Sequence, residues 1–199
     1  MKVYKITALG KPSDRRFKGY SALMAEDRVW TFLTPCGEGL NGSPFGRKWI
    51  PQTFYIEKPL IPKPNLFWIG PSAFVCDEKA RELAGEPLEM SGEFLLIHVE
   101  GEKGKYWIYN ITNCINVVDS KKSKWQKLGP GPNDRQLLKP SFIEARFGEE
   151  SIFKIPEDRG ARMYCLECSG DADDGEFKAV VEHHGLTGLE FELVWDDER

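Results

Sequence analysis

The sequence predicts an α+β fold that consists mostly of antiparallel sheet and contains two main helices. Three observations lead to this prediction: short β-rich runs separated by turn residues, two segments with helical spacing, and an alternating run at 189–195 directly after the second of these segments. The 199 residues are 41% hydrophobic and 12% aromatic, which is typical of a globular chain that buries one core. Global disorder is therefore not expected.

The chain is expected to have a β-rich part, residues 1–70, that is dense in proline and glycine, followed by an α+β part, residues 71–199. We expect the two to form one continuous globular unit. In the first part, the runs 3–6, 29–33 and 53–56 have the composition of strands and are separated by loop residues. Helical spacing is absent there, so the first part should contain sheet and loops only.

The first helix is predicted to begin at Ser72, which can act as an N-cap. Gly85 can end this helix in a left-handed turn. Between them, five apolar residues can share one broad face: Phe74, Val75, Ala80, Leu83 and Ala84.

A β-hairpin is predicted next, because residues 94–99 and 106–109 are two β-rich runs around a glycine-containing turn. Residues 114–118 could form a further strand. Residues 120–140 are polar and rich in lysine, with glycine and proline clustered together, so we expect a long mobile loop. Trp125 lies within this segment and should be the most exposed tryptophan.

The last part of the chain should contain two strands, a helix and a closing strand. The two strands are residues 152–155 and 163–166. For the helix, Asp173 is the predicted N-cap and Glu176 completes a capping box. Helical spacing gives this helix one face, formed by Phe177, Val180, Val181 and His184, and Gly185 is expected to end it. The closing strand should alternate. One of its faces would carry Leu189, Phe191, Leu193 and Trp195, and the other Glu190, Glu192 and Val194.

The formal net charge of −4 gives the protein no general attraction for nucleic acid or for an anionic membrane. A basic partner, in contrast, would be attracted. Residues 1–6 do not look like a secretion signal, and no run is long and apolar enough to span a bilayer. The five cysteines are an odd number that suits reduced thiols. We therefore expect a cytoplasmic protein that binds neither nucleic acid nor membrane.

One group of residues could be considered for zinc: Cys165 and Cys168 together with His183 or His184. Neighbouring histidines on a helix point about 100° apart, so only one of them could easily reach a shared ion. Cysteines three residues apart on a regular strand lie on opposite faces. We therefore interpret the cysteines as core thiols and the histidines as a partly exposed pair, and we predict no metal and no cofactor.

No enzyme signature is found in the sequence. His98 lies in a hydrophobic strand without an identifiable nucleophile beside it, and Cys36 has no neighbouring base or cation that would activate its thiol. The acidic run 171–175 does not have the ligand spacing of an EF-hand. No catalytic residue is predicted.

Several short runs resemble a family of bacterial immunity proteins of polymorphic toxin systems, a family formerly catalogued as a domain of unknown function. The runs are spread over most of the chain: 1–4, 74–83, 92–96, Asn110, 118–120, 152–156, 188–191 and 194–195. The resemblance implies that the protein binds a cognate toxin and neutralises it stoichiometrically. It carries no catalytic motif.

Many toxins of such systems act on nucleic acids and are basic, so acidic surfaces are the first candidates for contact. The candidate toxin-binding residues are Asp171, Asp173, Asp174, Glu190, Glu192 and the aromatic Trp125. Two alternatives remain: a small cytoplasmic enzyme of unknown reaction, which needs a converging polar pocket, and a scaffold or adaptor of a secretion system, which needs a broad apolar patch. The acidic residues could also belong to ordinary solvated faces.

Overall fold

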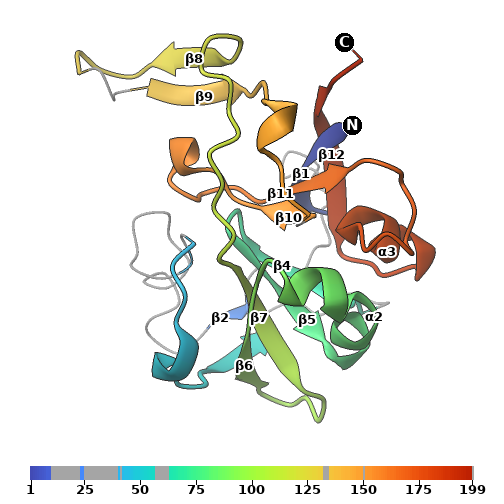
Figure 1. Ribbon diagram of the computed structural model, residues 1–199. Helices are drawn as coiled ribbons and strands as arrows, with labels where there is room; N and C mark the ends of the chain where they lie inside the picture. Colours follow the sequence, from blue (N-terminus) through green and yellow to red (C-terminus); the bar gives the residue numbers. More distant parts are fainter. Residues whose placement is uncertain are drawn as a thin grey trace.

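The computed structural model describes residues 1–9, 23–24, 40, 42–56, 63–131, 135–149 and 151–198 (Figure 1). Within these residues, most strands pair antiparallel, and the two α-helices lie side by side on one side of the molecule. The predicted α+β class with dominant sheet is therefore confirmed. The predicted strand 29–33 and Cys36 lie outside the described residues.

The larger sheet has the strand order β2-β3-β6-β7-β5-β4. The predicted hairpin forms its centre, since β6 and β7 pair antiparallel from Gly92↔Ile111 to Ile97↔Tyr106. Only the short contact between β3 and β6 is parallel. The strands span Leu23–Met24 (β2), Thr53–Ile56 (β3), Leu66–Gly70 (β4), Ala73–Asp77 (β5), Gly92–Val99 (β6) and Tyr106–Ile111 (β7).

The smaller sheet has the order β10-β11-β1-β12 and brings both ends of the chain together. Its strands span Lys2–Ala8 (β1), Ile152–Phe153 (β10), Tyr164–Glu167 (β11) and Leu189–Asp196 (β12). The amino-terminal ammonium donates to Asp197 at 2.8 Å. Strands from residues 1–70 and from residues 71–199 occur in both sheets.

The closing strand departs from the predicted alternation. Val3 pairs with Trp195 and Tyr4 with Leu193, so Val194 is the extra residue of a β-bulge. Because a bulge shifts the period of two by one residue, Trp195 packs with a different buried cluster from Phe191. Leu193 is left exposed. The predicted common face of Leu189, Phe191, Leu193 and Trp195 is therefore wrong.

The first helix, α2, spans Glu78–Glu89, and its N-cap lies five residues later than the predicted N-cap, Ser72. Phe74 and Val75 belong to β5, which is buried on both faces, and such a strand has a continuous apolar run that resembles a buried helix. Asp77 is the N-cap and accepts from the backbone N–H of Ala80 at 2.8 Å. Gly85 does not end the helix but lies buried inside it.

The segment 120–140 contains a two-stranded antiparallel hairpin where a loop was expected. It comprises β8 (Lys124–Lys127) and β9 (Arg135–Lys139), and Leu137 is its buried anchor. Residues 114–118 form no strand. Cys114 and Val118 instead make isolated bridges to Lys154 and Phe142.

The second helix, α3, spans Phe177–His183, and its N-cap position is Glu176 rather than Asp173. Phe177, Val180 and Val181 are buried as predicted, whereas His184 is exposed. The chain leaves the helix through Gly185 at φ +59°, a conformation that favours glycine. Three short 3-10 helices complete the described elements: Gly46–Lys48, Glu144–Arg146 and Pro156–Asp158.

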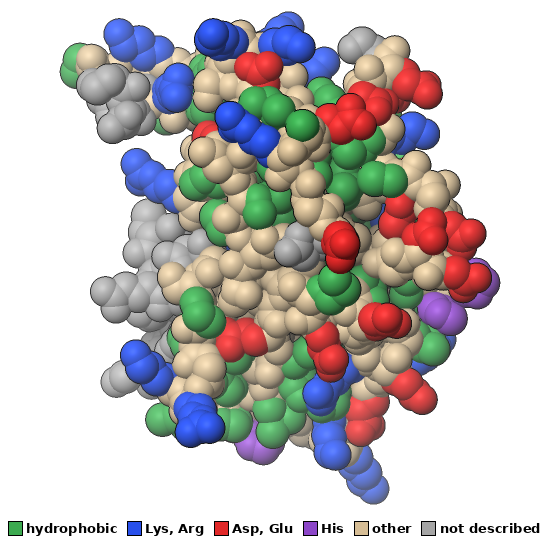
Figure 2. All heavy atoms as spheres, viewed as in Figure 1, with side chains coloured by type: hydrophobic (Ala, Val, Ile, Leu, Met, Phe, Trp, Pro, Cys, Tyr) green, Lys and Arg blue, Asp and Glu red, His purple; other side chains and the backbone are tan. Residues whose placement is uncertain are grey.

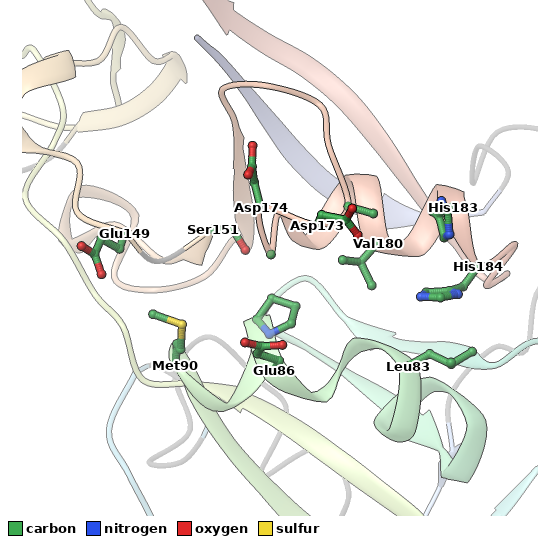
Figure 3. Close-up of a pocket in the computed structure, with 13 residues that line it drawn as sticks. Leu83, Glu86, Met90, Glu149, Ser151, Asp173, Asp174, Val180, His183 and His184 are labelled. Atoms are coloured by element: carbon green, nitrogen blue, oxygen red, sulfur yellow. The ribbon is translucent and has the colours of Figure 1, made fainter.

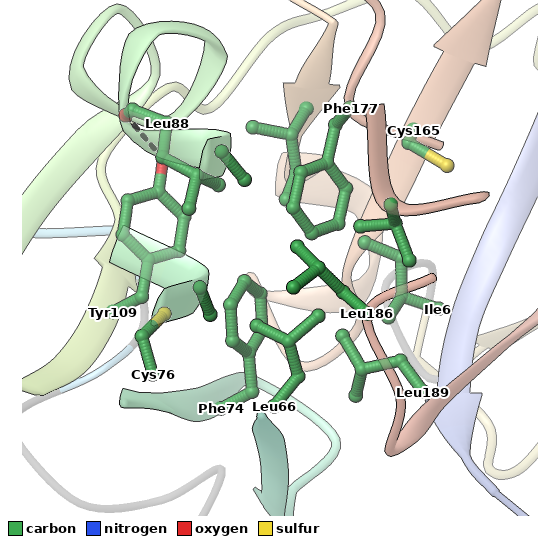
Figure 4. Packing of buried hydrophobic residues seen from close by; sticks show 14 of the residues in the cluster. Ile6, Leu66, Phe74, Cys76, Leu88, Tyr109, Cys165, Phe177, Leu186 and Leu189 are labelled. Atoms are coloured by element: carbon green, nitrogen blue, oxygen red, sulfur yellow. Dashed lines mark hydrogen bonds between the residues drawn. The ribbon is translucent and has the colours of Figure 1, made fainter. Parts of the chain in front are cut away.

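The central hydrophobic cluster joins both helices to both sheets. Phe74 stacks on Phe177 with ring centroids 5.7 Å apart, which links β5 to α3. Figure 4 shows Tyr109 beside α2, where its hydroxyl donates to the carbonyl of Leu88 at 2.7 Å. Ile6 of β1 lies across the cluster with Leu189. The pair α2 and α3 is therefore fixed on a shared core.

Candidate functional site

A cleft of about 590 Å³ lies between α2 and α3 and is the candidate site (Figure 3). One wall is α2, and the opposite wall is α3 with the loop before it. The lining residues are Leu83, Glu86 and Pro87 from α2 with Met90 at its C-cap, Ala172, Asp173, Asp174, Gly175, Val180, His183 and His184 from the opposite wall, and Glu149 and Ser151 at one end.

The cleft is acidic. Glu86, Glu149, Asp173 and Asp174 line it, and its described lining contains neither lysine nor arginine. None of these four carboxylates forms an ion pair with another described residue. Figure 2 shows Asp and Glu side chains gathered beside the two histidines, on the right of the view. A concave surface lined by one sign of charge concentrates its field and attracts cations.

Apolar side chains accompany the carboxylates. Val180 and Pro87 are buried against the core, and Leu83 is half-buried. Met90 is 56% exposed at the end of α2. An apolar surface surrounded by polar groups is the usual anatomy of a protein interface, and methionine adapts its shape to a partner.

The spacing along α2 explains why these residues share one wall. Ala80, Ala84 and Leu88 recur every four residues and face the core. Leu83, Glu86 and Met90 follow at intervals of three and four residues, so they form a neighbouring face. That face is turned toward α3 (Figure 3).

The acidic loop of the opposite wall is ordered by Glu176. This carboxylate is only 7% exposed, and it accepts from the backbone N–H groups of Cys168 at 2.7 Å, Ser169 at 2.8 Å and Gly170 at 2.9 Å. Successive N–H groups that converge in this way form an anion-binding nest. The loop leads from the nest directly into the aspartates of the cleft.

Two further hydrogen bonds hold the same loop and the start of α3. The carboxylate of Asp171 accepts from the backbone N–H of Asp173 at 3.0 Å. The hydroxyl of Ser151, the residue directly before β10, accepts from the backbone N–H of Phe177 at 3.0 Å and so caps the helix from a distant segment of the chain. The aspartates are thus presented by an ordered loop.

The structure separates the predicted toxin-binding residues into three places. Asp173 and Asp174 line the cleft, and Asp171 is exposed in the same loop. Glu190 and Glu192 lie on β12 outside the cleft, and Glu192 pairs with Lys5 at 2.8 Å.

Trp125 lies on β8, away from the cleft, and is half-buried rather than the exposed residue expected. The guanidinium of Arg135 lies 4.0 Å from the centre of its ring. Its indole N–H donates to the carbonyl of Ser120 at 3.2 Å.

Sequence reasoning missed Glu86, Glu149 and Met90. They are distant from the aspartates along the chain, and the expected end of the first helix at Gly85 placed Glu86 and Met90 outside it. Glu86 lies in the last turn of α2, and Met90 is its C-cap.

The residues considered for zinc do not converge. Cys165 is fully buried in the central cluster, and this burial raises the pKa of its thiol. His183 and His184 lie at the cleft with ring centroids 4.8 Å apart. In the part of the chain that the structure describes, no three His, Cys, Asp or Glu side chains form a group that could hold a metal ion.

His98, the histidine considered for an enzyme, is exposed on β6, where its backbone N–H donates to the carbonyl of Gln52 at 2.9 Å.

None of the helices in the described residues is long and apolar enough to cross a membrane. No protein-family model matches the sequence, and no curated protein matches it significantly.

Proposed function

We propose that this protein is a cytoplasmic immunity protein that binds a cognate bacterial toxin and neutralises it stoichiometrically. The sequence resemblance described above suggests this class of function. The acidic cleft between α2 and α3 supports it and is the observation on which the proposal depends. The toxin should present a basic surface there.

The physical reason is the balance of charge in the cleft. Four carboxylates line the cleft without a described cationic partner, so the lysines and arginines of a partner would meet complementary charge there. Such complementarity mainly accelerates association and excludes partners of the wrong charge. Burial of Met90 and Leu83 would add the apolar contribution that holds the complex together.

The first test identifies the partner. The tagged protein is purified from its native cells, and the proteins that remain bound are identified by mass spectrometry. The proposal expects one tight partner with a toxin-like domain whose surface is basic. Recovery of the chain alone, although the neighbouring genes are expressed, would contradict the proposal and favour a search for a small-molecule substrate.

The second test asks whether the cleft is the binding surface. Reversal of Asp171, Asp173 and Asp174 to lysine should weaken toxin binding by about tenfold or more, since several rim charges change sign together. A control variant reverses three exposed glutamates outside the cleft, so that the net charge changes equally: Glu100, Glu144 and Glu198. Equal affinities of the two variants would remove this cleft from the proposal.

A further inference from the structure

The β8–β9 hairpin carries a second charged surface, opposite in sign to the cleft. Every charged side chain in residues 120–131 and 135–141 is cationic. These side chains are all exposed, and none of them forms an ion pair with another described residue: Lys121, Lys122, Lys124, Lys127, Arg135 and Lys139. Figure 2 shows Lys and Arg side chains gathered at the top of the view, where Figure 1 places the hairpin.

The pairing of the hairpin brings like charges together. Lys124 lies directly opposite Lys139, and Lys127 lies directly opposite Arg135. Like charges at facing positions destabilise an antiparallel pair. An anion bound beside these pairs would reduce this repulsion.

A cleft of about 380 Å³ lies beside one of these pairs. Lys122, Lys124 and Lys139 line one side, and Leu193, Val194, Trp195 and Asp196 of β12 line the other. The bulge at Val194 interrupts the regular alternation of side chains between the two faces of β12. The cleft therefore combines three ammonium groups with a wall that is apolar except for the carboxylate of Asp196.

We propose that this cleft is a second protein-binding site, which takes an acidic segment of a partner protein. Carboxylates of the segment would contact Lys122, Lys124 and Lys139, and an apolar side chain between them would contact Leu193 and Val194. Leu128 and Leu138 are also exposed on or beside the hairpin, at 64% and 57%. The site is separate from the acidic cleft and does not depend on the proposed immunity function.

An acidic segment fits better than nucleic acid or a membrane. Arg135 already stacks on Trp125, the aromatic residue of the hairpin, and so occupies a ring face that a base would need. The whole protein has a net charge of −4, which would repel an extended polyanion that reaches beyond the hairpin. A short segment stays within the basic surface, and a concave apolar wall accepts a side chain rather than a lipid surface.

The test measures fluorescence anisotropy of a labelled peptide made of glutamate with interspersed leucine. Substitution of Lys122, Lys124 and Lys139 by glutamine should weaken binding of this peptide by about tenfold, because three exposed charge contacts are lost. A matched control changes three exposed lysines elsewhere to glutamine and should have less than about twofold effect: Lys79, Lys103 and Lys105. Replacement of the peptide's leucines by serine should weaken binding about fivefold through the lost apolar contact.

Several results would overturn the proposal. They are absence of peptide binding, equal effects of the two lysine triples, or stronger binding of labelled oligothymidine or of vesicles containing phosphatidylserine. Circular dichroism of each variant establishes that it is folded. The variant with Asp171, Asp173 and Asp174 reversed should bind the peptide at least as well as the unmodified protein, so failure of the toxin proposal can be told apart from failure of this one.

Discussion

Substitution of Glu176 by alanine should destabilise the protein and release the acidic loop. Three backbone N–H groups donate to this carboxylate at 2.7 to 2.9 Å. A hydrogen bond to a charged group contributes roughly 1.5–3 kcal/mol, but Cys168, Ser169 and Gly170 are all exposed, so their N–H groups can partly return to water. The expected loss is therefore that of one to two full bonds, about 3 kcal/mol in the free energy of unfolding.

Urea denaturation followed by tryptophan fluorescence measures this loss, and hydrogen exchange of the Cys168 and Gly170 amides reports directly on the loop. The matched control is alanine at Glu182, on the same helix, whose side chain is 58% exposed and pairs with Lys178 at 2.9 Å. This control should lose less than about 0.5 kcal/mol. Equal stability and equal amide exchange in the two variants would refute the assigned role of Glu176.

Three other predictions concern buried groups. Lys154 is fully buried, and desolvation lowers its pKa from 10.5 to about 8. Substitution by methionine removes this buried charge but also one hydrogen bond, so the net stabilisation near pH 7 should be about 2 kcal/mol. In the unfolded chain the Lys154 ammonium keeps its proton to higher pH, so the unmodified protein should gain stability between about pH 8 and 10.5. The difference in unfolding free energy between the methionine variant and the unmodified protein should therefore close over this range. Urea titrations near pH 7 and pH 10 that show the same difference would contradict this. Alanine at Gly188 would place its Cβ 1.7 Å from the carbonyl oxygen of Leu66 at φ +117°, so a loss above about 3 kcal/mol is expected, and a melting temperature equal to that of the unmodified protein would argue against this close approach. Phenylalanine at Tyr109 removes the hydrogen bond to α2 and should lower the unfolding free energy by about 1–2 kcal/mol in urea, whereas unchanged stability would show that this bond contributes nothing net.

Much of the sheet could be predicted from local pattern alone. The β6–β7 hairpin has two apolar runs around a glycine-containing turn, and the pattern required no knowledge of distant residues. The buried face of α3 was predictable for the same reason, because Phe177, Val180 and Val181 follow helical spacing.

The remaining features depend on contacts between distant segments. Phe74 and Val75 have an apolar pattern that fits a helix or a doubly buried strand, and only the layers on both sides of β5 decide between them. Among the described residues of β8 and β9, Leu137 alone is fully buried, so the alternation of these strands was too weak to be recognised. Glu176 looked like part of a local capping box, but its partners are the amides of residues 168–170.

The candidate cleft shows the same limit. Its two aspartates could be proposed from sequence because they precede a helix as a local acidic run. Glu86 and Glu149 join them only through the packing of α2 against α3, which no local spacing expresses. The sequence therefore predicted two of the four carboxylates that line the cleft, and the other two are brought there by the tertiary structure.

The most direct test of the central claim is a titration of the partner toxin's activity with this protein. The account predicts that inhibition is complete at one equivalent, and that reversal of Asp171, Asp173 and Asp174 moves the endpoint to a clear excess while the control reversals leave it unchanged. Full toxin activity in the presence of excess unmodified protein would contradict the immunity function. An endpoint that all three proteins share would leave neutralisation intact but contradict the role of the α2–α3 cleft.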